Sequence, residues 1–230
     1  MDIHQQIKPD LINKHEADIK KCPLLIADGN LTVEALAAAL KLAEKYNIPV
    51  LFEPTDVPIC NKPFKTNYWK TIKYITPNLV ELKCIAEILK ISFPNISLDP
   101  VEDASRVGKV LANYIPNIII TLGEDGVVVV RRASSSSSPL FNYKSTSPDN
   151  IEARHYPATT VRGFINVSGA GDCLASGIVA AMLSGLSEEK CIKVGFQSAL
   201  CAMFSESAVP SILFDKNHSS WNSIAHHIQL

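Results

Sequence analysis

A strand, a helix and a second strand follow one another in the first quarter of the chain. Residues 24–27 form a short apolar run that ends in the polar turn 28–30, as expected for a strand that stops at a turn. Thr32 can cap a helix that continues to about Tyr46, and residues 50–53 form the next apolar run. Such a unit places its two strands in parallel, because the helix crosses over one face of the sheet. We therefore predict an α/β fold, with a mostly parallel sheet flanked by helices.

The same alternation continues through the rest of the chain. Further strands are predicted at residues 74–76, 118–122 and 127–131, and further helices at residues 78–90, 102–113, 170–184 and 188–204. The short turn 123–126 contains two glycines and joins two of these strands, which predicts a hairpin. A last short helix is expected near Ile224.

The chain is long enough and apolar enough to form one globular domain. Its 230 residues are 47% hydrophobic and 20% charged, which favours a packed core over global disorder. The formal net charge of −1 gives no electrostatic attraction for nucleic acid or an anionic membrane, so neither is an expected partner. Residues 133–150 include a serine run at 134–138 and are predicted to form a flexible surface loop.

Six cysteines are scattered along the chain without a C-x-x-C pair. This spacing matches neither a disulfide framework nor a zinc site, and it predicts small buried side chains in a reducing compartment. Residues 1–18 are too polar for a signal peptide, and no apolar run is long enough to span a membrane. We therefore expect a soluble protein of the cytoplasm.

A run of small residues before an apolar helix gives the strongest indication of chemistry. Gly169, Ala170 and Gly171 would let an anion approach the backbone N–H groups at the start of the helix 170–184. Asp172 follows where its carboxylate could take a proton from a hydroxyl that attacks a phosphate. The alternative is a tight turn with an acidic residue in the first helical turn, which the helix dipole favours in any case.

Two weaker motifs lie next to predicted strand ends. Thr121, Gly123 and Gly126 lie where ligands of open α/β sheets bind, although an ordinary hairpin turn would contain the same glycines. Asn78 and Glu81 are three residues apart at the start of a predicted helix. That spacing is typical of a capping box, and it also suits two residues that hold Mg²⁺ beside phosphates. From the spacing alone, capping is the favoured interpretation.

The order of these three motifs resembles that of the PfkB (ribokinase-like) family of carbohydrate and nucleoside kinases, from about residue 7 to residue 210. The resemblance implies an ATP-dependent phosphotransferase that uses ATP and Mg²⁺. It also implies an anion hole at Gly169, Ala170 and Gly171, a general base at Asp172, ATP contacts at Thr121, Gly123, Gly126 and Gln197, and a Mg²⁺ and phosphate site at Asn78 and Glu81.

Within this family, the chain is most similar to the pseudouridine kinases. The similarity lies in residues 27–31, in residues 168–173, and in residues 52–54, where many sugar kinases have Asp-Pro. The resemblance implies that the acceptor is the 5′-hydroxyl of a nucleoside, with pseudouridine as the expected substrate. Ribose, adenosine and other sugars or nucleosides are the alternatives.

The chain departs from the family pattern at two places. Asn166 stands where many relatives carry an Asp that helps to bind a monovalent cation, so K⁺ dependence is in doubt. Full members begin with strands that carry a glycine-rich substrate motif and a small β lid, and neither precedes Leu24. We expect residues 1–230 to be the C-terminal, ATP-binding portion of a single kinase domain, truncated at its N-terminus.

Such a truncation would leave one edge of the sheet without its neighbour. An open edge with apolar surface is suited to association, so a homodimer or a partner chain could cover it. A catalytically silent nucleotide-binding or interaction module is the alternative to an active kinase.

Overall fold

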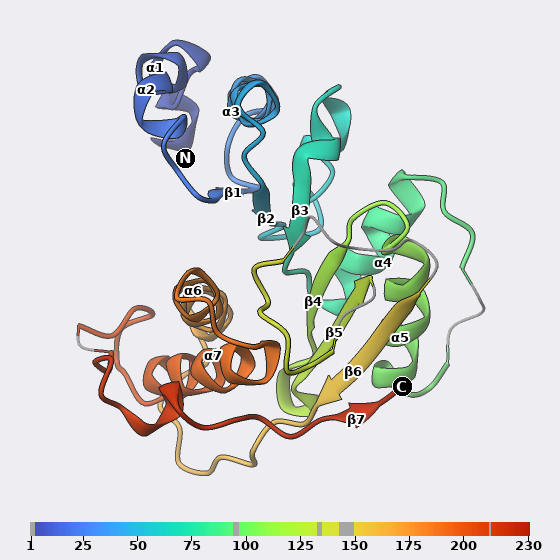
Figure 1. Ribbon diagram of the computed structural model, residues 1–230, viewed down its shortest axis with the longest axis vertical. Helices are drawn as coiled ribbons and strands as arrows, with labels where there is room; N and C mark the ends of the chain where they lie inside the picture. Colours follow the sequence, from blue (N-terminus) through green and yellow to red (C-terminus); the bar gives the residue numbers. More distant parts are fainter. Residues whose placement is uncertain (1–2, 94–96, 133–134, 143–149, 212) are drawn as a thin grey trace.

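The computed structural model describes residues 3–93, 97–132, 135–142, 150–211 and 213–230. Within these residues a seven-stranded sheet forms the centre, and its strands follow one another across the sheet in chain order (Figure 1). The strands are β1 (Leu25–Asp28), β2 (Val50–Glu53), β3 (Ile72–Ile75), β4 (Asn117–Thr121), β5 (Val127–Arg132), β6 (Ile151–Tyr156) and β7 (Ile228–Gln229).

The first four strands are parallel, and the later strands join antiparallel. Strands β1 to β4 pair in parallel, whereas β5, β6 and β7 each run antiparallel to the strand before. The predicted mostly parallel sheet and the hairpin of β4 and β5 are therefore confirmed. Because parallel strands end at the same edge, the carboxyl ends of β2, β3 and β4 lie together.

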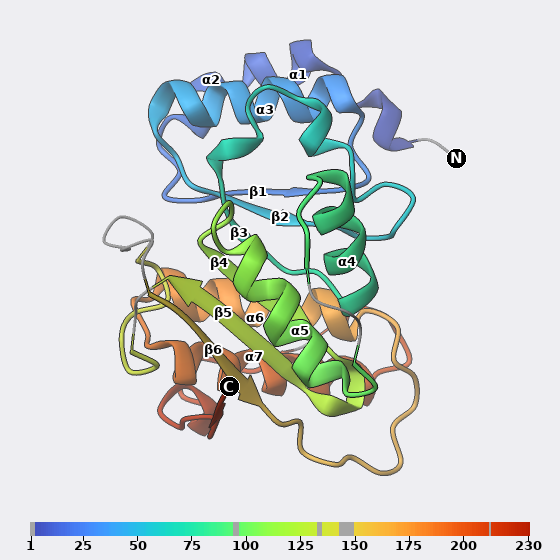
Figure 2. The same ribbon diagram turned by 90° about the vertical axis from the view of Figure 1, so that its right-hand side faces the viewer.

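Helices cover both faces of this sheet. The α-helices are α1 (Pro9–Lys14), α2 (Glu16–Ile19), α3 (Val33–Tyr46), α4 (Leu79–Ile88), α5 (Pro100–Leu111), α6 (Ala170–Leu183) and α7 (Glu188–Met203). Short 3₁₀ turns are η1 (Ile3–Gln6), η2 (Pro63–Lys65), η3 (Trp69–Thr71), η4 (Gly123–Asp125) and η5 (Ser219–Trp221). Figure 2 shows α4 and α5 in front of the sheet, with α6 and α7 behind it.

Alternation along the strands divides the core into two apolar layers. In β4, Ile118 and Ile120 face the layer that contains α3, α4 and α5, whereas Ile119 faces the layer under α6 and α7. The same alternation separates Phe52 from Leu51 in β2. Side chains of a strand point to opposite faces in turn, so a sheet covered on both sides needs such continuous apolar strands.

Helices α6 and α7 pack closely because glycines lie at their interface. A Cβ atom on Gly195 would lie 2.6 Å from Cγ1 of Ile178, and one on Gly177 would overlap the side chain of Ser198. The missing side chains let the two helix backbones approach. Helix α6 is therefore held firmly, and its first turn carries the Gly169–Asp172 motif.

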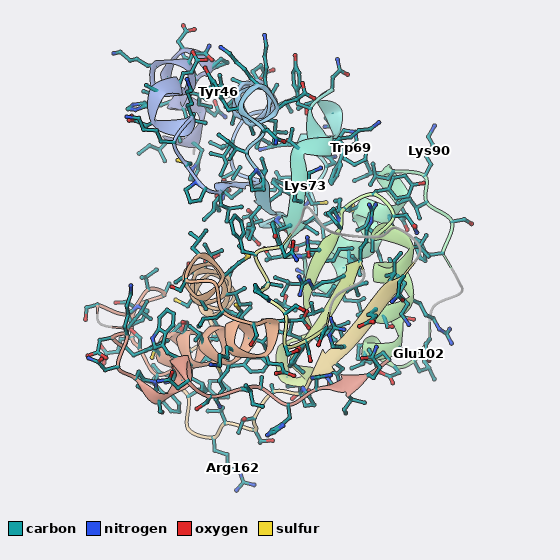
Figure 3. The ribbon with its side chains drawn as sticks, viewed as in Figure 1. Tyr46, Trp69, Lys73, Lys90, Glu102 and Arg162 are labelled. Carbon is teal, nitrogen blue, oxygen red and sulfur yellow. The ribbon has the colours of Figure 1, made fainter. Side chains whose placement is uncertain are left out.

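The N-terminal helices rest on α3 at one end of the molecule. The carboxylate of Glu16 accepts hydrogen bonds from Lys45 Nζ and from Tyr46 Oη, each at 2.6 Å. Tyr46, the last residue of α3, contacts these helices through Glu16, whereas Arg162 projects into solvent at the opposite end of the molecule (Figure 3). No helix among the described residues has both the length and the apolar character needed to cross a membrane.

The structure corrects the sequence prediction in the C-terminal third. The helix expected near Ile224 is absent: residues 223–227 have no regular structure, and they lead into the short strand β7. There Ala225 N donates to Glu189 O, and Leu230 N donates to Ala153 O, so the tail is held in an extended course along the domain. Strand β6 was not predicted, because charged residues interrupt its apolar pattern.

The predicted loop 133–150 lies partly outside the described residues, at 133–134 and 143–149. Of the described residues of this loop, 135–142 pack against the connection between α6 and α7. Leu140 is fully buried there, its N–H donates to Leu186 O, and Pro139 forms an isolated bridge with Ser187.

A buried charged cluster joins the start of α7 to the sheet. The carboxylate of Glu188 accepts hydrogen bonds from Arg131 (2.9 Å), Arg154 (2.8 Å) and Tyr156 (2.7 Å), and all four side chains are buried. Burial alone would raise the pKa of Glu188, but the hydrogen bonds and charges of the two arginines outweigh it and lower that pKa. The cluster explains how β6 can bury an arginine.

Candidate active site

The first turn of α6 begins at a glycine that no other residue could replace without strain. Gly169 is the N-cap and has a left-handed backbone, with φ of 75°. A Cβ atom at this position would also overlap the carbonyl of Ala208. Both the backbone conformation and the close approach of Ala208 therefore require glycine here.

The backbone N–H groups that follow are available to a ligand. Among the described residues, no acceptor is found for the N–H groups of Gly171 and Asp172, whereas Cys173 N donates to Gly169 O. A Cβ atom added to Gly171 would meet open space. Unpaired N–H groups at the positive end of a 14-residue helix attract anions. The exposed carboxylate of Asp172 lies in the same turn.

Helix α4 begins with the predicted capping box. Asn78 Oδ1 accepts from Glu81 N, and Glu81 Oε2 accepts from Asn78 N, each at 2.9 Å. The capping interpretation is therefore confirmed. Glu81 is only 4% exposed, and no hydrogen bond to its Oε1 atom is found among the described residues. Capping thus leaves one carboxylate oxygen for a further partner.

A cavity of about 250 Å³ joins these two helix starts to the carboxyl ends of the parallel strands. It is lined by Glu53, Thr55, Thr76, Asn78, Glu81, Thr121, Gly169, Gly171, Asp172, Leu174 and Ala175. Six of the ten residues predicted for the site are therefore brought together: Asn78, Glu81, Thr121, Gly169, Gly171 and Asp172. The carboxyl ends of the parallel strands, the capped start of α4 and the glycine-rich start of α6 therefore all line the same cavity.

Four predicted residues are absent from the lining of this cavity. Ala170 belongs to the same helical turn, and its N–H is used by Val167 O. Gly126 has φ of 90° and touches the backbone of residues 156–158, so its need for glycine is structural. Gly123 faces open space, and Gln197 lies on α7, where its Nε2 donates to Cys201 Sγ at 3.8 Å.

Glu53 lies at the end of β2 and was not predicted as a site residue. Thr55 donates from Oγ1 to Glu53 Oε2 at 2.8 Å, and the same Oγ1 accepts from Gly29 N at 3.1 Å. Thr55 has φ of 71°, which is unusual for a β-branched residue and occurs mostly where surrounding contacts impose it. This turn holds the carboxylate of Glu53 in the wall of the cavity.

The pKa values of two carboxyl groups in the cavity wall, Glu53 and Glu81, are raised above the ordinary value. Burial raises the pKa of Glu53 against the hydrogen bonds from Thr55, and the charges of Glu81 and Asp172 raise it further. Burial also raises the pKa of Glu81. A cation or a hydrogen-bond donor in the cavity would stabilise the charged form of both groups.

The hydroxyl of Thr76 identifies a place where a polar ligand is needed. Thr76 is 5% exposed, lines the cavity, and its Oγ1 atom has no hydrogen-bond partner among the described residues. Glu53, Thr76 and Glu81 thus present hard oxygen donors to one space. This set suits Mg²⁺, which proteins usually bind through one or two carboxylates, with water and phosphate oxygens completing the shell. No group of three or more His, Cys, Asp or Glu side chains with metal-binding geometry occurs in the described part of the chain.

Glu53 and Thr76 could have been found from the sequence. Each residue lies at or directly after the carboxyl end of a predicted parallel strand. The same position in the sequence pattern led to the prediction of Thr121 as a site residue. The burial of Thr76 and the hydrogen bond that orients Glu53 depend on contacts distant in the chain, and these required the structure.

Asn166 connects two loops beside α6. Its Oδ1 accepts from Ser168 N at 2.7 Å, and its Nδ2 donates to Ser205 O at 2.8 Å. The amide therefore joins the segment before α6 to the segment after α7. An aspartate at this position could not donate to Ser205 O.

Known structures share this arrangement of sheet and helices. The structure of adenosine kinase from Sinorhizobium meliloti matches 90% of this chain and 56% of its own, with a TM-score of 0.65 and 18% identity. Arabidopsis thaliana ribokinase complexed with ribose and ATP matches 86% of this chain and 56% of its own, with a TM-score of 0.62 and 14% identity. The fold is therefore a ribokinase-like α/β fold.

Sequence comparison then gives the family. Residues 2–213 match the pfkB family carbohydrate kinases, and the chain belongs to this family. Pseudouridine kinase of Arabidopsis thaliana is 30% identical over 239 aligned positions, which cover 89% of this chain. The chain spans 62% of the length of that relative. The predicted family and fold are thus confirmed, and the similarity to pseudouridine kinases is confirmed with them.

Proposed function

We propose that this chain carries the phosphoryl-transfer site of an ATP-dependent kinase whose acceptor is the 5′-hydroxyl of a nucleoside, with pseudouridine as the substrate. The observation that carries the proposal is the position of Asp172, which lies beside unpaired helix N–H groups and lines one cavity with Glu53 and Glu81. Membership of the pfkB family and the similarity to a pseudouridine kinase support it.

Each group at the cavity has a chemical role in this proposal. Asp172 accepts the proton of the acceptor hydroxyl, and its exposure leaves its carboxylate accessible. The N–H groups of Gly171 and Asp172, with the backbone of Gly169 and Ala170, stabilise the negative charge on the transferred phosphoryl group. Positioning and charge stabilisation of this kind supply most of the catalysis in phosphoryl transfer.

The opposite wall is suited to a metal ion. Glu81, oriented by Asn78, would hold Mg²⁺ together with Glu53, and Thr76 would donate to a bound water or phosphate oxygen. When bound, Mg²⁺ neutralises part of the phosphate charge. Thr55 keeps Glu53 directed at this position through the hydrogen bond from its hydroxyl.

The rest of the nucleotide would extend past Thr121. A cavity of about 250 Å³ accommodates a phosphate chain, so the adenosine moiety would lie beyond it, across the open face of Gly123. Gly126 supports that turn through its backbone, and Gln197 on α7 is the polar side chain proposed for the adenine. The ATP bound to the solved plant ribokinase supports ATP as the phosphoryl donor.

We also propose that the reaction does not need K⁺. Asn166 Nδ2 already donates to Ser205 O, so this carbonyl has a partner without a cation. Six free cysteines are consistent with a cytoplasmic location, which we propose for the protein.

The first experiment is a transfer assay with Mg-ATP and a panel of pseudouridine, uridine, adenosine and ribose. The proposal predicts one preferred acceptor, pseudouridine, with the phosphate on its 5′-oxygen, as located by NMR of the product. Equal rates in Na⁺ and K⁺ buffers are expected. Transfer to ribose alone would contradict the nucleoside assignment, and absence of transfer in a preparation that binds ATP would favour a silent nucleotide-binding module.

A further inference from the structure

Two thiols meet beside the cavity, although 24 positions separate them in the chain. Cys60 Sγ lies 3.5 Å from Cys84 Sγ and 3.2 Å from Val57 O. Both are free cysteines, and the sulfur atoms are in van der Waals contact. The S–S distance in a disulfide is about 2.05 Å, so the two sulfur atoms would have to approach by about 1.5 Å.

The two cysteines differ in accessibility and in their supporting structure. Cys60 is fully buried in the apolar layer under α3 and α4, within a segment of turns that follows β2. Cys84 is partly exposed on α4, one turn after Glu81. The turn segment has fewer backbone constraints than a helix, so it is the side that would move toward α4.

We propose that Cys60 and Cys84 form a thiol pair that hydroperoxides oxidise reversibly to a disulfide, and that this bond restrains the neighbouring carboxylate site. The first part of the proposal is independent of the kinase activity. The effect on catalysis rests on the proposed function.

The reaction begins at the accessible sulfur. The Cys84 thiolate attacks one oxygen of hydrogen peroxide, the O–O bond breaks, and the products are a sulfenic acid at Cys84 and hydroxide, which takes up a proton to become water. Cys60 Sγ then attacks the Cys84 sulfur and loses its proton, while the S–O bond breaks and the hydroxyl leaves as a second water. Two thiols lose two electrons in total, and one peroxide is reduced to two waters.

The environment of Cys60 agrees with this order of events. Burial, the hydrogen bond with Cys84 and the charges of Cys84 and Glu81 together raise the pKa of the Cys60 thiol to about 12. A thiol that ionises so rarely reacts slowly with peroxide by itself. The contact with Cys84 places the Cys60 sulfur where it can attack a sulfenic acid formed at Cys84.

The bond would connect the two segments that carry Glu53 and Glu81, two of the three carboxylates of the cavity. Glu81 lies one helical turn before Cys84, and Glu53 with Thr55 precedes the turn segment that carries Cys60. Moving that segment toward α4 would shift Glu53 relative to Glu81. Displacements of about 1 Å at a catalytic site can reduce turnover by about 10²-fold, so the oxidised form is expected to be at least about tenfold less active.

The test begins with the modification itself. The purified chain is treated with an equimolar amount of hydrogen peroxide, free thiols are blocked with N-ethylmaleimide, and peptides are mapped by mass spectrometry with and without dithiothreitol. We expect a Cys60–Cys84 cross-link that dithiothreitol removes, in the natural chain and in Cys22→Ser, and its absence in Cys84→Ser. Cys22 is a suitable control because it is partly exposed and lies far away in the sequence. Sulfinic acid at Cys84 without a cross-link, or cross-links to other cysteines, would overturn the proposal.

Thermal unfolding and activity then provide two separate readouts. A cross-link that closes this loop should raise the melting temperature by roughly 5–10 °C in the natural chain and in Cys22→Ser, and not in Cys84→Ser. Loss of transfer on oxidation, restored by dithiothreitol, supports the effect on the site, and unchanged transfer refutes it. A cross-linked chain that shows no transfer in either redox state would leave the modification established and would refute the proposed kinase activity.

Discussion

At the scale of single residues, two backbone positions fix the geometry of the cavity. Gly169 has a left-handed conformation and contacts the Ala208 carbonyl. This arrangement places the N–H groups that follow Gly169 at the rim of the cavity. Thr55 has a left-handed conformation without being glycine, and its hydroxyl orients Glu53. Strain at such positions is retained where surrounding contacts impose it, and it is concentrated at functional sites.

Asn78 offers a direct test of whether the capping box also serves a metal. Replacing Asn78 by Ala should cost about 1 kcal/mol of unfolding free energy, because Glu81 N loses its acceptor. It should also weaken Mn²⁺ binding by about 10–100-fold, as loss of an orienting partner does at metal sites. Urea unfolding and electron paramagnetic resonance titration with Mn²⁺, without nucleotide, measure the two effects.

Thr32→Ala is the matched control for this variant. Thr32 caps α3 by accepting from Ala35 N at 3.1 Å and is not part of the cavity lining. The Thr32→Ala variant should lose a similar amount of unfolding free energy and keep the Mn²⁺ affinity of the natural chain. Equal Mn²⁺ affinities in the two variants would show that Asn78 only caps the helix.

The residues of the site differ in how far the sequence could predict them. Gly169 and the capping pair are recognised locally, because a glycine before a helix and an Asn–Glu spacing have a local physical cause. Thr76 lies at the end of a predicted strand and its position could have been predicted, but the unpartnered state of its hydroxyl depends on burial by other segments. Gln197 was assigned only from its place in the resembled family, and it lies on α7, outside the cavity lining.

At the scale of secondary-structure elements, the position of α6 depends on α7. Buried ion pairs hold the start of α7 against the sheet. Glu188 in the first turn of α7 contacts arginines of β5 and β6, and α7 packs along α6. Apolar periodicity predicted both helices, but it could not predict β6, where the buried Arg154 is paired with the carboxylates of Glu188 and Glu152. The tail near Ile224 was wrongly predicted as helical because backbone bonds to α7 and β6 hold it extended.

Glu188 should make stability depend on pH in a defined direction. Its folded-state pKa lies below the ordinary value of 4.5, so its contribution to stability is present above about 4.5 and is lost as the pH falls through the folded-state pKa. Glu188→Gln should cost about 3–5 kcal/mol at pH 7, because two arginines lose a buried charged partner.

Urea unfolding of the natural chain and of Glu188→Gln between pH 7 and pH 3 measures this contribution. The stability difference should shrink as the pH falls below 4.5. Glu44→Gln, at an exposed position on α3, should show no such difference. A difference that stays constant over the whole range would contradict an ionised Glu188 in the folded state.

At the scale of the whole molecule, the sheet ends on one side at β1. Among the described residues β1 pairs only with β2, and Ile26 in β1 is 55% exposed. An edge strand with an exposed apolar side chain is a surface for pairing. We propose that a second copy of the chain or a partner chain covers this edge.

The purified chain should therefore form a concentration-dependent dimer in sedimentation equilibrium, through a contact that uses the same edge on both copies. Ile26→Lys, which adds a charge to that edge, should shift the equilibrium toward monomer without changing the helical circular dichroism. A natural chain that stays monomeric at high concentration would rule out the homodimer and leave only a different partner chain.

We propose that Asp172 accepts the proton of the acceptor hydroxyl in a phosphoryl-transfer site. The most direct measurement compares the natural chain with Asp172→Asn, a substitution that keeps the shape of the side chain and removes its basicity. Turnover with Mg-ATP and pseudouridine should fall by about 10²–10⁴-fold, while ATP affinity measured by calorimetry changes by less than about threefold. Transfer at an undiminished rate in Asp172→Asn would show that Asp172 is not the base of this reaction.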